Sequence, residues 1–437
     1  MEMPARSKKA PAARVLTALL GLAAAPAFAA DDSPYLFGDW NGERTRLAEK
    51  GIRFDFGYTG EAAHNASGGT RHTTRYADQW VFGSTLDLDK LWGWHGGEFQ
   101  LVVTNRNGRN LSDDANLGVY QQVQEVYGRG QTWLLTVFAL KQQLFDGKLE
   151  WRVGRLPVGT DFDSLPCDFQ NLTFCGSQPG NIVGDYWINW PVSQWATTLK
   201  WNTTDQTYVR LGAYQLNPRY VDNTWARANG WKLNFPDGTT GVLLPFEFGW
   251  TPTLNGLPGS YKLGGWYNNA GGEHLYYDRN HQPIALTGEA PLTESARRGG
   301  YIALQQQITG EAGGKGLSLF FNGTMADSST SAVDRQFALG AMLNGPFNRS
   351  KDRIGVAVGT THGSNELVRY ARLYNQLNAD APMPVADTYE LASEVFYDWY
   401  PIPSLSVRPN LQYVVNPGGS TQNRNAFVLG LKTSVAF

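Results

Sequence analysis

Cysteine is nearly absent from the chain, and long apolar runs are missing beyond its N-terminal region. The 437 residues include two cysteines, so at most one disulfide can form, and one bridge cannot be the main support of a fold this long. No later apolar run approaches the ~18 residues that indicate a transmembrane helix. Charged side chains make up 17% of the residues, against about 25% in ordinary soluble domains. These shortages argue against a disulfide scaffold, a bundle of membrane helices and an ordinary soluble domain.

Motifs for catalysis and for metal or nucleic-acid binding are missing as well. The chain has no H-E-x-x-H, G-x-S-x-G or G-x-G-x-x-G, and its six histidines show no ligand spacing. No basic patch indicates nucleic acid. We therefore expect no enzyme, no cofactor and no metal. The many carboxylates keep a glycoside hydrolase or a secreted carbohydrate-binding protein as an alternative.

Residues 1–29 have the order of a secretory signal peptide. Basic residues between Arg6 and Arg14 precede the apolar run VLTALLGLAAAPAF and the small-residue site AFA at 27–29. Cleavage after Ala29 removes four basic residues and one acidic residue, which moves the formal net charge from −2 to −5. The mature chain is therefore predicted to be exported and mildly acidic.

The two cysteines lie eight positions apart in a loop-like stretch, LPCDFQNLTFCGSQPGN at 165–181. Because an exported chain meets oxidants, we interpret Cys167 and Cys175 as a disulfide. A bridge of this span contributes roughly 2.5 kcal/mol by chain entropy, which is small for a protein of this length. We expect it to fix the shape of a loop. Two free thiols or half of a metal site are the alternatives.

Glycine, aromatic residues and segments of alternating polarity are abundant. The 49 Gly, 15 Trp, 20 Tyr and 21 Phe indicate β structure with many turns. In TYVRLGAY, for example, Val209, Leu211 and Ala213 fall on one face of a strand. Turn signals such as FDGK at 145–148 and NPGG at 416–419 separate the segments, and no linker divides the chain. Expected strands lie at or near 52–59, 81–88, 98–106, 149–153, 195–202, 207–214, 261–267, 317–325, 337–343, 354–360, 389–399, 405–415 and 426–437.

Three features favour a membrane barrel over a soluble sandwich, which also has alternating strands. Many tryptophans, including Trp92, Trp201 and Trp399, fall at the ends of expected strands, where barrels have aromatic belts. Strands of ~10 residues with a polar inner face suit a barrel that spans lipid. The last strand ends on Phe437, which resembles the signal read by the barrel assembly machinery. We therefore predict an all-β fold, a transmembrane antiparallel β-barrel over 53–437 in outer-membrane lipid.

Arginine, glutamate and tryptophan are concentrated between residues 104 and 195. Guanidinium and carboxylate groups hydrogen-bond to hydroxyl groups, and indole faces stack on the C–H faces of sugars. The segment therefore suggests a sugar site, although pores generally have charged inner walls and tryptophan often belongs to an aromatic belt. The residues concerned are Arg106, Arg109, Glu125, Arg129, Arg152, Arg155, Trp187, Trp190 and Trp195.

Segments along the whole mature chain resemble the OprB-type carbohydrate-selective porins. They include FGDWNGERTRLAEKGI (37–52), EFQLVVTNRNGRNLS (98–112), VQEVYGRGQ (123–131), LPCDFQNLTFCGSQPGN (165–181), NWPVSQWA (189–196), NGLPGSYKLGGWYN (255–268) and VRPNLQYVVNPGG (407–419). The resemblance implies a 16-stranded barrel with inward-folded loops that carries glucose and related monosaccharides by facilitated diffusion. A general diffusion porin is the alternative within the same class.

The resemblance also implies which residues contact the sugar. Arg106, Glu125 and Trp190 are the expected contacts at the narrowest point, with Arg129 and Arg155 as further positive groups. Glu125 shares its parity with apolar neighbours, so we expect it on a folded loop. Strict alternation directs Arg155 toward lipid, where arginine costs about 2–4 kcal/mol. We expect a strand end or a bulge to turn it inward.

The N-terminal segment 30–52 contains a short expected helix at 41–51. Asn41 is its expected cap and Gly51 its stop. A helix of this length is marginal alone, so we expect it to dock against the barrel. The sequence leaves the preferred sugar open, and the oligomeric state open between a monomer and a homotrimer.

Overall fold

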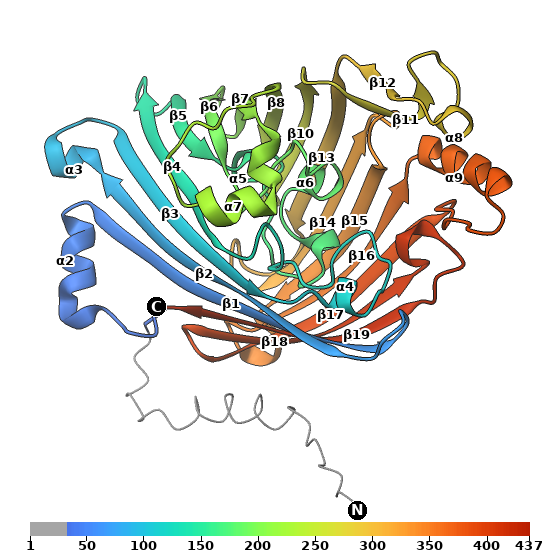
Figure 1. The fold of residues 1–437 in the computed structure, drawn as a ribbon. Coiled ribbons are helices and arrows are strands. Elements are labelled where there is room, and N and C mark those ends of the chain that lie inside the picture. The colour runs from blue at the N-terminus through green and yellow to red at the C-terminus, as the bar shows by residue number, and fades with distance from the viewer. Residues whose placement is uncertain (1–32) are drawn as a thin grey trace, which may run out of the picture.

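Sixteen long strands form one antiparallel sheet that closes on itself where β1 pairs with β19 (Figure 1). The structure, a computed structural model, describes residues 33–437, so the predicted signal peptide lies outside the described residues. The predicted 16-stranded barrel is confirmed. Its strands are β1 (Ile52–Ser67), β2 (Thr74–Asp87), β3 (Gly97–Gly108), β4 (Trp133–Leu144), β5 (Leu149–Leu156), β6 (Gln194–Asn202), β7 (Thr207–Leu216), β8 (Gly241–Trp250), β10 (Leu257–Asn268), β13 (Arg297–Gln307), β14 (Gly316–Ala326), β15 (Val333–Asn344), β16 (Arg353–Gly363), β17 (Tyr389–Ile402), β18 (Leu405–Val415) and β19 (Ala426–Ala436).

Shorter elements occupy the connections between these strands. No helix in residues 33–437 is long and apolar enough to cross a membrane. The short strands are β9 (Thr253–Leu254), β11 (Gly272–Asp278) and β12 (Pro291–Glu294). The helices are α2 (Glu43–Glu49), α3 (Leu88–Trp92), α4 (Leu111–Asp114), α5 (Val158–Asp161), α6 (Gln178–Ile182), α7 (Asn223–Asn229), α8 (Ile284–Thr287) and α9 (Asn365–Leu377), and the 3-10 turns are η2 (Trp40–Gly42), η3 (Leu172–Phe174), η4 (Pro218–Val221), η5 (Pro346–Asn348) and η6 (Pro417–Gly419).

The outer face of the barrel is apolar because of the alternation along its strands. Pairing across five neighbouring strands aligns one exposed row, Trp201, Val209, Phe248, Leu263 and Ile302. Such a surface promotes aggregation in water, whereas lipid covers it. The adjacent row points inward and is charged, with Arg210 of β7 opposite Glu247 of β8. The strands therefore present an apolar face to lipid and a polar face to the lumen.

The two ends of the barrel differ in the length of their connections. At one end the strands are joined by short turns, such as the predicted turn 145–148 between β4 and β5. At the other end most connections are long, among them 109–132, 157–193 and 269–296. Outer-membrane barrels have short periplasmic turns and longer extracellular loops. We therefore place the short turns in the periplasm.

Two of the long connections, 109–132 and 157–193, fold into the barrel and narrow it (Figure 1). Their apolar side chains pack against the inner wall. The rings of Phe169 and Phe396 lie 4.9 Å apart, and Trp187 is fully buried in a second cluster. The hydrophobic core therefore lies inside the barrel, between these two loops and the wall. Below, they are called the first inward loop (109–132) and the second inward loop (157–193).

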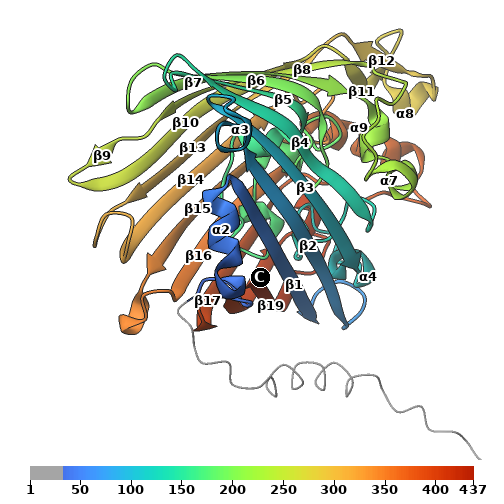
Figure 2. The ribbon, with the colours of Figure 1, turned by 90° about the vertical axis from the view of Figure 1, so that its left-hand side faces the viewer.

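The predicted N-terminal helix is α2, which docks beside the seam where the barrel closes (Figure 2). Arg44 donates from Nη2 to the backbone oxygen of Phe437 at 2.6 Å. The backbone nitrogen of Leu36 donates to the oxygen of Ala436 at 2.7 Å. The helix therefore gains from the last strand the support that its own length does not supply.

The predicted cap of this helix is wrong, whereas the predicted stop is confirmed. Asn41 has a φ of 58° and Gly42 occupies the cap position. The carboxylate of Asp39 accepts from the backbone nitrogen of Thr45 at 2.9 Å and so supplies the oxygen expected from Asn41. Gly51 follows the helix with a φ of 93°, a left-handed conformation that favours glycine.

Candidate functional site

A cavity of about 1320 Å³ lies between the two inward loops and the wall. Four of the five predicted sugar-contacting residues line it. Arg106 comes from β3, Glu125 and Arg129 from the first inward loop, and Trp190 from the second. The fold thus brings together residues that are up to 84 positions apart in the sequence.

Arg106 and Trp190 meet at one amide group, that of Gln79 on β2. Arg106 lies opposite Gln79 in the strand register, and its Nε donates to Gln79 Oε1 at 2.8 Å. Nε1 of Trp190 donates to the same oxygen at 2.9 Å. Gln79 therefore orients both a guanidinium group and an indole ring toward the cavity that it also lines.

Glu125 lies on a loop, as predicted, and its carboxylate stands between two cations. Nζ of Lys432 is 2.8 Å from its Oε1, and Nη2 of Arg106 is 3.9 Å from its Oε2. The side chains of Arg106 and Glu125 are 6% and 10% exposed. A carboxylate has about four acceptor positions. The geometry therefore leaves Glu125 able to accept hydrogen bonds from a hydroxylated solute.

Arg129 lies in a tight turn of the first inward loop, with a φ of 60° between two glycines that also have positive φ. Its Nη2 donates to the backbone oxygen of Gly184 in the second inward loop at 3.1 Å. Burial lowers the pKa of the Arg129 guanidinium, and the charge of Asp185 opposes this shift. Because the pKa of an arginine side chain normally lies far above neutral pH, Arg129 stays positive there.

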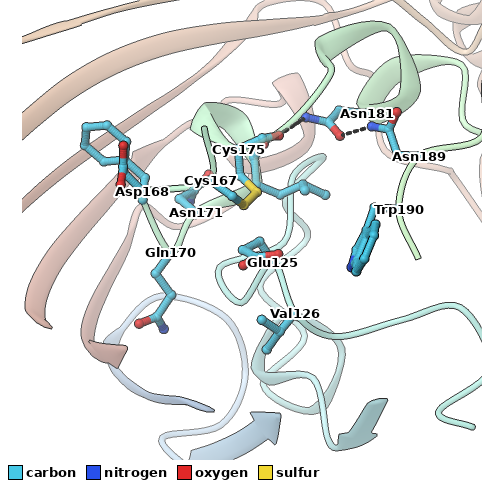
Figure 3. Close-up of a disulfide and its surroundings, with 12 residues drawn as sticks. Glu125, Val126, Cys167, Asp168, Gln170, Asn171, Cys175, Asn181, Asn189 and Trp190 are labelled. Atoms are coloured by element: carbon cyan, nitrogen blue, oxygen red, sulfur yellow. Dashed lines mark hydrogen bonds between the residues drawn. A yellow bond between two sulfur atoms is a disulfide. The ribbon is translucent and has the colours of Figure 1, made fainter. Parts of the chain in front are cut away.

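The predicted disulfide is present, and both of its cysteines line the cavity. The Cα atoms of Cys167 and Cys175 are 4.3 Å apart. Figure 3 shows the bridge close to Glu125, with Asn181 donating to the backbone oxygen of Cys175 at 3.0 Å. The two sulfurs and a Glu125 oxygen lie within 4.8 Å of one another. Bonded sulfurs are not thiolates, however, so this group does not have the ligands of a metal site.

Buried polar side chains of the wall tie the inward loops in place. Glu394 of β17 accepts from the backbone nitrogens of Gln170 and Asn171 at 2.9 and 2.7 Å. Glu390, four residues earlier on the same strand, accepts from the backbone nitrogen of Tyr120 at 2.7 Å. Buried backbone groups need such partners. The shape of the cavity is therefore fixed by the wall as well as by the loops.

The structure does not bring Arg155 to the cavity. The pairings of β5 with β4 and β6 are regular from Leu149 to Leu156, so the expected inward turn at a bulge is wrong. Instead, Arg155 keeps its regular position on the strand, and other parts of the chain bury its side chain. Its guanidinium lies over the ring of Tyr220 from the β7–β8 connection, and Nη2 donates to the backbone oxygen of Ser193 at 2.9 Å. Burial under a loop thus replaces the expected inward turn.

Of the three tryptophans that the sequence offered, only Trp190 lines the cavity. Trp187 is fully buried, and its Nε1 donates to the hydroxyl of Ser177. Trp195 donates from Nε1 to the backbone oxygen of Asn234. These two side chains bond to neighbouring parts of the chain, and neither lines the cavity.

Sequence reasoning missed several residues of this site. Gln79, Glu61 and Lys432 hold Arg106, Trp190 and the first inward loop in place. Their one signal in the sequence is a polar side chain at an inward position of an alternating strand. Many residues of a pore share that signal.

The arrangement suits a neutral, hydroxylated solute. Arg106 and Arg129 offer hydrogen-bond donors, Glu125 offers acceptors, and the flat indole of Trp190 offers a surface for C–H groups. Carboxylates stand near both guanidinium groups, Glu125 beside Arg106 and Asp185 beside Arg129.

Comparisons with known proteins agree on one family. The family described as "Carbohydrate-selective porin, OprB family" matches residues 71–437. Porin B of Pseudomonas aeruginosa is 44% identical, with 98% of this chain and 99% of that protein covered. Putative porin QuiX of Acinetobacter baylyi is 32% identical, with 94% of each covered. The high pH structure of Pseudomonas putida OprB matches with a TM-score of 0.90 and 44% identity, over 94% of this chain and 100% of that one. This chain belongs to the OprB family of carbohydrate-selective porins, which are outer-membrane channels and not enzymes.

Proposed function

We propose that this porin takes up glucose and related monosaccharides by facilitated diffusion, through a constriction formed by Arg106, Glu125 and Trp190 with Arg129 beside them. The observation that carries the proposal is the convergence of these four side chains on one cavity inside a barrel. Sugars have hydroxyl groups that both donate and accept, and C–H faces that stack on aromatic rings. The family description, which names carbohydrates, supports the same class of solute.

Binding at this constriction has to be weak and reversible. A site that binds sugar raises the local concentration of a dilute solute, but tight binding slows its release and limits flux. The carboxylate and both guanidinium groups are already held by protein contacts. The sugar therefore meets a prearranged site with little ordering cost, and its affinity comes from a few hydrogen bonds and one stacked ring.

The test is single-channel current in a planar bilayer during titration with glucose. We expect glucose to reduce the current of the wild type. We expect Arg106→Ala, Glu125→Ala and Trp190→Ala each to raise the half-blocking concentration about tenfold, which corresponds to ~1.4 kcal/mol of lost binding. Lys141→Ala is the control, because Lys141 pairs with Glu98 at 2.7 Å on the wall and does not line the cavity.

Two outcomes contradict the proposal in different ways. A wild-type current that no sugar reduces points to a general diffusion porin. A glucose block that is equal in the wild type and in all three variants keeps the function but rejects these residues as its site. Heat-modifiable gel mobility confirms that each variant still forms a folded barrel.

A further inference from the structure

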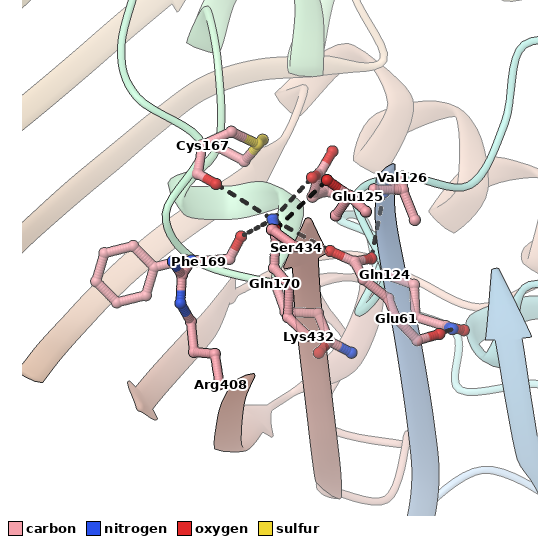
Figure 4. A network of polar contacts seen from close by, with 12 residues as sticks. Glu61, Gln124, Glu125, Val126, Cys167, Phe169, Gln170, Arg408, Lys432 and Ser434 are labelled. Atoms are coloured by element: carbon pink, nitrogen blue, oxygen red, sulfur yellow. Dashed lines mark hydrogen bonds and ion pairs between the residues drawn. A yellow bond between two sulfur atoms is a disulfide. The ribbon is translucent and has the colours of Figure 1, made fainter. Parts of the chain in front are cut away.

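Lys432 of the last strand lies at the centre of the polar network beneath the constriction (Figure 4). Its side chain is 4% exposed. Nζ donates to Oε1 of Glu125 at 2.8 Å, to the backbone oxygen of Cys167 at 3.2 Å and to that of Phe169 at 3.1 Å. The first acceptor belongs to the first inward loop and the other two belong to the disulfide-closed part of the second. One ammonium group therefore joins both loops.

Glu61 of the first strand completes this arrangement. It lies directly opposite Lys432 where the barrel closes, and its Oε1 is 3.2 Å from Nζ. This contact is an ion pair without hydrogen-bond geometry, since Oε1 has no hydrogen-bond donor. Its other oxygen, Oε2, accepts from the backbone nitrogen of Val126 at 3.2 Å. Glu61 thus supplies counter-charge to Lys432 and a second support to the loop that carries Glu125.

The donors of the ammonium group show how it is used. Four oxygens lie within 3.2 Å of Nζ; three belong to the inward loops and one, Oε1 of Glu61, belongs to the wall. A lysine that served only to hold the seam would not need three acceptors in the loops. We propose that Lys432 is a positioning residue of the constriction, which holds the Glu125 carboxylate and the disulfide loop in the geometry that binds sugar.

Barrel closure and assembly of the constriction are consequently one event. Glu61 and Lys432 belong to the first and last strands, and they become neighbours only when β1 pairs with β19. Before that pairing the loops lack their common anchor. Removing the ammonium also leaves the carboxylates of Glu61 and Glu125 near each other in a buried place, where like charges repel. Glu125 then loses the hydrogen bond that fixes its position between Lys432 and Arg106.

This proposal rests on the proposed sugar function, so its experiment has one readout with sugar and one without. The variant is Lys432→Met, and the matched control is Lys141→Met, another inward wall lysine paired with a glutamate. The first readout is the half-blocking glucose concentration in bilayers. The second is the rate at which dithiothreitol reduces Cys167–Cys175 in the folded barrel, because a released loop would expose Cys175, which is only 7% exposed here.

We expect Lys432→Met to raise both the half-blocking concentration and the rate of reduction about tenfold, the effect of losing one well-placed polar anchor. Lys141→Met should change neither. A folded Lys432→Met barrel with wild-type values for both overturns the proposal. If the wild type shows no sugar block, the sugar function fails, and the reduction rate still decides whether Lys432 holds the loop.

If Lys432→Met does not fold, a second variant, Lys432→Arg, tests the proposal. It keeps the positive charge opposite Glu61. The planar guanidinium cannot reproduce three diverging donors. We expect this variant to fold and to show weaker glucose block with faster reduction. If Lys432→Met does not fold and Lys432→Arg matches the wild type in both readouts, Lys432 has a purely structural role in the seam.

Discussion

Gln79 shows how much of this site depends on residues that need not touch the solute. One oxygen accepts from both Nε of Arg106 and Nε1 of Trp190. The substitution Gln79→Leu keeps the approximate size and leaves two donors unpaired, each at a cost of about 1–3 kcal/mol. We expect Gln79→Leu to raise the half-blocking glucose concentration about tenfold, since both side chains lose their common orientation.

The control for this substitution is Gln100→Leu. Gln100 also lies on the inner wall and also accepts from an arginine, Arg152, at 3.0 Å, but it does not line the cavity. Bilayer titrations of the two variants are compared directly. Equal effects of the two substitutions mean that Gln79 has no special part in the site.

Residues that line the cavity were predictable only where a motif contained them. Arg106, Glu125 and Trp190 lie in segments that resemble the family, and the parity of Glu125 correctly placed it on a loop. Arg155 was misplaced because alternation gives the face of a strand but does not say what covers that face. Lys432 was missed because its partner Glu125 is 307 positions away, a separation that only the closed barrel removes.

The disulfide loop is expected to contribute little to the stability of the barrel and more to its discrimination between sugars. Its bridge closes a short loop, so it contributes only roughly 2.5 kcal/mol by chain entropy. The same loop, however, contains the backbone oxygens of Cys167 and Phe169 that bind Lys432. We expect the double variant Cys167→Ser/Cys175→Ser to lose discrimination between glucose and larger sugars while the barrel unfolds at nearly the wild-type urea concentration.

Two measurements on that variant separate the two roles. Half-blocking concentrations for glucose and for a disaccharide give the discrimination, and urea unfolding in lipid vesicles gives the stability. If the ratio of the half-blocking concentrations for glucose and the disaccharide is unchanged, the disulfide has a purely structural role. The wild type treated with reductant also lacks the disulfide, so it should behave like the double variant in both measurements.

Among the sixteen long strands of the barrel, those with clean alternation were predicted and three others were not. The missed strands are β4, β8 and β13. β4 is apolar on both faces, because Leu134 and Val137 point inward and pack beneath the inward loops. β8 contains a proline and β13 two adjacent glycines, which weaken a strand signal. An apolar inner face thus hides the alternation of β4, whereas proline and glycine hide β8 and β13.

At the scale of the whole molecule, the apolar outer surface predicts that a charged substitution on it destabilises the barrel in lipid. Leu263 lies in the middle of β10 and is 60% exposed on that surface. We expect Leu263→Arg to destabilise the barrel by about 2–4 kcal/mol, the cost of arginine near the bilayer midplane. Leu263→Phe keeps an apolar side chain and should have little effect.

Urea titration of both variants in lipid vesicles measures the difference. Equal stability of Leu263→Arg and the wild type would falsify the assignment of this face to lipid. The inner wall shows that the lipid-facing position, and not the height in the barrel, sets this cost, because Arg210 lies on the inner wall at the same level.

The anchoring of both inward loops to the wall has a thermodynamic consequence. A site whose carboxylate and carbonyl groups are fixed by Glu394, Glu390 and Lys432 presents the same geometry to a solute from either side of the membrane. It lowers the barrier for entry and for exit by the same amount, so it speeds equilibration and leaves the equilibrium unchanged. Any accumulation of sugar inside the cell must therefore draw its free energy from a later step that traps or consumes the sugar.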